Sequence, residues 1–221
     1  MFNRLMLFAA FLSLVLLTGC AAQKVTSYET SGFMGSYAGL EVGSESQPNL
    51  VYLNPSASFR SYNKILIDHV VIYFNKDSKN KGVDPGELTK LSEYFHKSLV
   101  GVLQDRYTIV DQPGDGVLRI RTAITDVVPG KPAANTLSSI IPVGMAIHAI
   151  KKSTTGTNLA VGQASMEMEL LDSLTGERVA AAIDRREGGK QVISGKWSAI
   201  EEAFDHWSKK LRVFLDRQKA M

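Results

Sequence analysis

The chain has 221 residues, of which 44% are hydrophobic and 21% are charged, a balance typical of a globular protein. Twenty-five Lys and Arg against 22 Asp and Glu leave a net charge of +3, too small an excess to indicate a nucleic-acid-binding protein. A single Cys excludes an intramolecular disulfide framework and a cluster of thiolate metal ligands. The length allows one domain, or two small ones, with a hydrophobic core.

The first residues have the pattern of a bacterial secretion signal. Arg4 supplies one positive charge, and residues 5–17 (LMLFAAFLSLVLL) form an apolar run interrupted only by Ser13. This run is too short to span a membrane comfortably, so it favours a signal peptide over a transmembrane helix. It leads into Leu17-Thr18-Gly19-Cys20, which resembles the lipobox of bacterial lipoproteins.

The lipobox resemblance implies that residues 1–19 are cleaved and that Cys20 is acylated. The acyl chains would anchor the protein to a membrane, at about 0.8 kcal/mol per buried CH₂ group. Ala21, rather than Asp, follows the cysteine, which implies the outer membrane, facing the periplasm, over the inner membrane. The alternatives are an ordinary signal peptide with a chance cysteine and an N-terminal anchor helix.

Residues 20–48 are expected to be the lipidated N-terminus and a flexible tether, since 21–48 are rich in Ser, Gly, Gln and Glu. Within them Phe33, Tyr37 and Leu40 recur at helical spacing. Two interpretations are open. The segment packs back on its own domain, or Phe33 and Tyr37 contact a partner.

Residues 49–221 are expected to form a single domain. Residues 65–74 are almost continuously apolar and β-branched, which predicts a strand covered on both faces. Asp84, Pro85 and Glu87 offer an N-cap, a proline at N1 and a carboxylate at N3, which predicts the start of a helix. This helix should run to about residue 106.

Further strands follow from alternating apolar and polar residues. A short strand is expected at 107–110 and a half-buried one at 118–124. Residues 164–170 and 179–183 also alternate, and the turn sequence 172–177 between them predicts a hairpin.

A second helix is predicted near the C-terminus, with Ser198 as N-cap and Glu201 at N3. Its apolar stripe comprises Ile200, Phe204, Trp207, Leu211 and Phe214. The order of elements predicts an α+β fold in two layers, a mostly antiparallel sheet with two main helices packed on one face.

Several short motifs together resemble a known family. They are Ser31-Gly32-Phe33 with Tyr37, Asp84-Pro85, Thr155-Gly156-Thr157, Leu174-Thr175-Gly176-Glu177 with Asp184-Arg185-Arg186, Gly188-Gly189-Lys190, and Ala203-Phe204 with Trp207. The chain resembles an uncharacterised bacterial lipoprotein family known as a domain of unknown function (domain of unknown function 3313). The resemblance covers nearly the whole mature chain and implies no enzymatic activity.

The sequence contains no recognisable catalytic constellation. His69, His96, His148 and His206 form no metal-binding pair, and no GxSxG motif is present. Gly188-Gly189-Lys190 lacks the upstream glycine and the Ser or Thr of a phosphate-binding loop. We expect no catalytic residue, no cofactor and no metal.

Asp68 is the one carboxylate within the apolar run 65–74. A buried, unpaired charge there would be costly, so we expect a partner across the sheet, Arg119 or Arg121. The alternative is an envelope hydrolase in which Asp68 acts as acid or base beside a second carboxylate.

Residues 133–150 (AANTLSSIIPVGMAIHAI) contain no Asp, Glu, Lys or Arg. Pro142 and Gly144 argue against a transmembrane helix. The stretch is either a buried crossover or an exposed apolar surface, through Ile141 and Ile147, that contacts lipid or a partner. A third class, a carrier of a lipid-like ligand, would need a cavity beneath it.

Basic residues gather in the last part of the chain. Arg185, Arg186 and Lys190 are candidates for contact with an anionic envelope polymer or lipid headgroups, and a solvated charged face is the alternative. The sequence thus predicts an outer-membrane lipoprotein facing the periplasm. Its role would be non-enzymatic binding or assembly with another envelope component, and not with nucleic acid.

Overall fold

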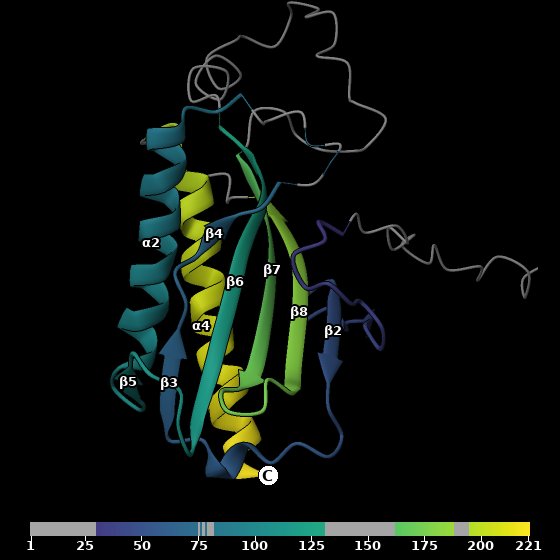
Figure 1. Cartoon of the computed structure of the whole chain (residues 1–221). Helices are drawn as coiled ribbons and strands as arrows, with labels where there is room; N and C mark the ends of the chain where they lie inside the picture. The colour runs from purple at the N-terminus through teal and green to yellow at the C-terminus, as the bar shows by residue number, and fades with distance from the viewer. Residues whose placement is uncertain (1–29, 75, 77, 79–81, 131–161, 188–194) are drawn as a thin grey trace, which may run out of the picture.

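The computed structural model of the chain describes residues 30–74, 76, 78, 82–130, 162–187 and 195–221. Within them, a mixed sheet forms one layer and two α-helices form the other (Figure 1). Cys20 and the expected signal peptide, the apolar stretch 133–150 with Ile141 and Ile147, and Lys190 lie outside the described residues.

The sheet has eight strands in the order β1-β2-β8-β7-β6-β3-β5, with β4 also paired to β6. Pairing is antiparallel from β1 to β6, whereas β3 and β4 run parallel to β6 and β5 runs parallel to β3. The expected α+β fold is confirmed. The strands are β1 (Glu41–Val42), β2 (Leu50–Leu53), β3 (Lys64–Ile67), β4 (Val71–Ile72), β5 (Thr108–Val110), β6 (Val117–Val128), β7 (Gln163–Asp172) and β8 (Arg178–Glu187).

The predicted strand over 65–74 is divided into β3 and β4, so the expectation of one continuous strand is wrong. Ile67 lies opposite Ile120 of β6, and Val71 lies opposite Ala123. Three residues, 68–70, therefore lie between these pairs where β6 has two, 121 and 122, and the extra residue interrupts the strand pairing. The interruption falls at Asp68, whose backbone N–H still donates to the Ile120 carbonyl at 3.0 Å.

Helix α2 (Pro85–Leu103) begins as predicted. Asp84 is its N-cap, and its side chain accepts a hydrogen bond from the Glu87 N–H at 3.0 Å. A short 3₁₀ helix, η1, covers Phe59–Ser61.

Helix α4 (Ser198–Ala220) starts one residue earlier than predicted, because its N-cap is Trp197 rather than Ser198. The Ser198 hydroxyl donates to the Gly195 carbonyl at 2.9 Å. The side chain of Glu87, in the first turn of α2, contacts the residues that precede α4. It accepts from Lys196 Nζ at 2.7 Å and from the Trp197 indole at 3.2 Å.

The core fills the space between the helices and the sheet. At its centre the rings of Phe95 (α2) and Phe204 (α4) stack at 4.5 Å, and Trp207 lies 5.9 Å from Phe95. Both phenylalanines are fully buried. Among the described residues, no helix is long and apolar enough to cross a membrane.

Phe204→Ala should lower the free energy of unfolding by about 3–5 kcal/mol, because it leaves a cavity at the centre of the helix pair. Urea denaturation followed by circular dichroism measures this loss. As a control, Leu174→Ala, at a turn residue 60% exposed, should change it by less than about 0.5 kcal/mol. A loss at Phe204 no larger than at Leu174 would contradict the stacked core.

Candidate functional site

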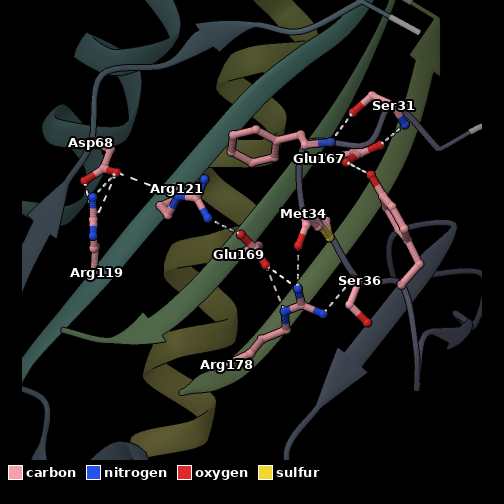
Figure 2. Close-up of polar contacts among 11 residues, drawn as sticks. Ser31, Met34, Ser36, Asp68, Arg119, Arg121, Glu167, Glu169 and Arg178 are labelled. Atoms are coloured by element: carbon pink, nitrogen blue, oxygen red, sulfur yellow. Dashed lines mark hydrogen bonds and ion pairs between the residues drawn. The ribbon is translucent and has the colours of Figure 1, made fainter. Parts of the chain in front are cut away.

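The face of the sheet opposite the helices carries a row of charged side chains (Figure 2). Arg119 and Arg121 come from β6, Glu167 and Glu169 from β7, and Arg178 from β8. Each pair on one strand is two residues apart, so its members point to the same face. In the register, Arg121 lies opposite Glu169 and Ala123 lies opposite Glu167.

Opposite charges alternate along this row. Arg119 donates two bonds from Nε and Nη2 to Asp68, at 2.9 and 2.8 Å, and Arg121 Nε lies 3.9 Å from the same carboxylate. Arg121 Nη1 binds Glu169 at 2.8 Å, and Arg178 Nε binds Glu169 at 2.9 Å. The hydrogen bond that Arg119 donates to the Asp68 carboxylate raises the pKa of Arg119. The pairing predicted for Asp68 is confirmed, and it involves both arginines.

Glu167 differs from its neighbour because no cation among the described residues pairs with it. It is fully buried, yet its two oxygens accept from the Ser31 backbone N–H at 2.6 Å and from the Tyr37 hydroxyl at 2.7 Å. The Tyr37 oxygen in turn accepts from the Gly32 N–H at 2.7 Å. Burial, followed by the bond to Glu167, raises the pKa of Tyr37.

Both donors belong to residues 31–40, which cross the charged face and which we call the N-terminal clasp (Figure 2). Arg178 reaches out of the sheet to the clasp, donating to the carbonyls of Ser36 at 2.8 Å and Met34 at 3.1 Å. Met34 is buried against Ala181 and Ile183 of β8. Charge pairing and apolar burial therefore hold the same segment.

The clasp explains the two aromatic residues singled out in the sequence. Phe33 lies under Arg121, whose guanidinium carbon is 4.9 Å from the ring centroid, and its ring is 6.0 Å from that of Tyr73. Phe33 and Tyr37 thus contact their own domain. Residues 30–48, expected to belong to a flexible tether, lie against the sheet and contribute β1.

Glycine accounts for this difference. Gly32, Gly35 and Gly39 have φ angles of 100°, 71° and 79°, in the left-handed region that other residues rarely adopt. The composition that predicts a tether is also the one that lets the clasp turn sharply over the sheet.

The basic residues of the last part of the chain make mostly internal contacts. Arg185 donates to Gln163 at 3.0 Å, Lys196 to Glu87, and Lys219 to the Tyr62 carbonyl at 2.9 Å. Burial, followed by the charge of Arg186, lowers the pKa of His206.

The two histidines near Asp68 form a stacked pair. The rings of His69 and His96 are 5.1 Å apart, and His96 Nδ1 lies 3.3 Å from the Asp68 carbonyl oxygen. Burial lowers the pKa of His96. In the described part of the chain, no group of three or more His, Cys, Asp or Glu side chains could hold a metal ion.

Sequence reasoning placed Glu167 and Glu169 only as polar residues of a hairpin and missed the contacts of Glu167 with the clasp and of Glu169 with Arg121 and Arg178. A signal was present, because two carboxylates and two guanidinium groups recur at a spacing of two on adjacent strands. Once β6 and β7 are paired, this pattern predicts a charged row on one face.

The model of one protein family matches residues 29–211 of the chain. The chain belongs to the family described as "Protein of unknown function (DUF3313)". The match begins at the clasp, and the resemblance noted in the sequence is confirmed. No curated protein matches the chain.

Solved structures with weak similarity include the PelC dodecamer from Paraburkholderia phytofirmans. It is 13% identical with a TM-score of 0.40, over 73% of this chain and 94% of that chain. A protein of the family DUF330 from Xanthomonas campestris is 11% identical with a TM-score of 0.36, over 76% of this chain and 93% of that chain.

Glu167→Gln should loosen the clasp, because an amide can accept one of the two hydrogen bonds but turns an N–H towards the other donor. Hydrogen bonds to a charged group contribute about 1.5–3 kcal/mol, so unfolding should become easier by that order. Hydrogen exchange of the backbone amides of residues 31–40 should accelerate more than exchange of the backbone amides in the helices.

Glu41→Gln is the matched control, since Glu41 lies on the exposed strand β1. Tyr37→Phe tests the same contact from the other side, and its effect should not add fully to that of Glu167→Gln. Unchanged exchange of residues 31–40 in Glu167→Gln would show that this carboxylate does not hold the clasp.

Proposed function

We propose that this protein is an acylated lipoprotein of the outer membrane that faces the periplasm. Its folded domain would bind or assemble with another envelope component and would not catalyse a reaction. The membrane contact would be the lipid on Cys20, and the partner an envelope protein or an anionic envelope polymer.

The proposal of a non-enzymatic role rests on the contacts that the carboxylates of the sheet make. Asp68 is held by Arg119 and Arg121, Glu169 by Arg121 and Arg178, and Glu167 by the clasp. A general acid or base needs a titratable atom within hydrogen-bond reach of the substrate group to which it gives, or from which it takes, a proton. These carboxylates instead bind the chain's own donors, which favours a structural role.

The clasp also bears on how the domain would sit at the membrane. Eleven residue-to-residue steps lead from Cys20 to Ser31 (31 − 20), and they could extend to at most about 40 Å. A tether reaching to residue 48 would extend to more than twice that distance. The domain is therefore expected to stay close to the bilayer that holds its anchor, as a partner in the same membrane would require.

Cys20→Ser should abolish labelling by a radioactive or clickable fatty acid and should change the protein's fractionation with outer membranes, because the hydroxyl is not the thiol that the lipid-transfer step requires. Ala21→Ser, which keeps the cysteine, is the control and should behave as the wild type. Ala21→Asp should move the protein towards the inner membrane. Labelling of Cys20→Ser at the wild-type level would refute the acylation.

The proposed partner surface can be tested at Arg185 and Arg186. Photocrosslinking groups at position 186 in intact cells should capture an envelope component, and the double substitution Arg185→Glu, Arg186→Glu should abolish capture by a probe at a neighbouring position. Lys97→Glu is the control, since that side chain is 79% exposed on α2. Capture unaffected by the double substitution would place the partner contact elsewhere.

A further inference from the structure

A groove of about 270 Å³ lies between α4 and the β2–β8 edge of the sheet, on the face opposite the clasp. Apolar side chains of β2, β7, β8 and α4 line it. In Figure 1 α4 lies behind the strands of the sheet, α2 lies further to the left, and neither helix extends behind β2. The helical layer is therefore incomplete at this edge, and the groove lies where it ends.

Small residues make the groove hollow. Ala180 and Ala182 of β8 lie opposite Leu170 and Met168 of β7, on the side of the sheet that faces α4. A larger side chain at either position would fill space between β8 and α4. The groove thus follows from alanine at two positions of a strand where β-branched or larger residues are common.

The groove leaves apolar surface in contact with water. Leu53 of β2 is 45% exposed and Val213 of α4 is 53% exposed, and both line it. Met166 and Met168 lie in its wall, and methionine adapts its shape to an apolar ligand. A slender alkyl chain would bury this surface.

Two cations line the same groove. Lys210 and Arg217 are seven residues apart on α4, which is about two turns and puts them on one side of the helix. Neither forms an ion pair with any described residue, and Lys210 Nζ makes only a long contact of 3.4 Å to the Ser46 carbonyl. No Asp or Glu is among the described residues that line the groove.

We propose that this groove binds a single-chain anionic amphiphile. The alkyl chain would lie against Ala180, Ala182 and Leu211, and the carboxylate or phosphate headgroup would lie between Lys210 and Arg217. The volume lies just below the range of ligand pockets, roughly 300–1,000 Å³, which fits one alkyl chain rather than two. This inference does not depend on the lipid anchor or on the partner proposed above.

The test uses the full chain in nanodiscs of phosphatidylcholine and dodecanoic acid with a photoreactive diazirine in its alkyl chain. Mass spectrometry should map saturable labelling to β8 and to residues 211–217. Unlabelled dodecanoate and dodecyl phosphate should compete, and the stronger competitor identifies the headgroup. The uncharged methyl ester of dodecanoate should compete much less.

Two kinds of variant separate the alkyl and charge contributions. Ala182→Phe should abolish labelling by filling the groove. The exposed pair Lys210→Glu, Arg217→Glu should weaken labelling about tenfold by reversing both charges. Lys90→Glu, Lys209→Glu is the matched control, with the same change of charge on exposed positions outside the groove, and it should label as the wild type.

The proposal is overturned if labelling is not saturable, or if the methyl ester competes as well as dodecanoate. It is also overturned if reversal of Lys210 and Arg217 leaves labelling unchanged. Circular dichroism checks the fold of Ala182→Phe. If that variant does not fold, the charge-reversal pair decides, because its two positions are exposed and their replacement leaves the core intact.

Discussion

A buried carboxylate that pairs with no cation among the described residues is the constraint on which the clasp face of this protein depends. Glu167 lies in the middle of β7, opposite Ala123 on one side and Ile183 on the other, and neither side chain can donate a hydrogen bond. Burying such a group without donors would cost several kcal/mol. The donors therefore come from outside the sheet, from Ser31 and Tyr37, and the N-terminal segment has to return to the sheet to supply them.

The other contacts of the clasp follow from that return. Met34 is brought over β8, where it is buried with Ala181 and Ile183, and its carbonyl meets Arg178. Arg178 also binds Glu169, so the clasp is connected to the row of charges that continues through Arg121 and Asp68 to Arg119. The clasp is thus attached to one face of the sheet mainly by polar contacts, whereas α2 and α4 pack against the other face through apolar side chains. The alternation of side chains along β7 serves both faces, with Met166, Met168 and Leu170 towards the helices and the two glutamates towards the clasp.

The regular part of this architecture could be predicted from the sequence, because its signals are local. The N-cap at Asp84, the hairpin of β7 and β8, and the apolar stripe of α4 are each read from neighbouring residues. Where the outcome depended on contacts distant in sequence, prediction failed. Whether Glu167 faces water or the chain depends on Ser31 and Tyr37, which are 136 and 130 positions away. The break at Asp68 likewise depends on the register with β6. The pairing of Asp68 was predictable since the cost of a buried charge is independent of topology.

The order of contacts along the clasp determines how the domain would resist a pull. Tension arriving from the N-terminal side reaches the Ser31 N–H bond to Glu167 first, then the Tyr37 hydroxyl bond to the same carboxylate. The contacts are thus loaded in succession rather than together, so the segment would peel from the sheet. The force that detaches it is then set by its strongest single contact, and until the clasp has opened the load enters the sheet through Glu167 of β7 rather than through the helices. For a domain held at a membrane by its N-terminus, the clasp would act as the element that yields before the fold does.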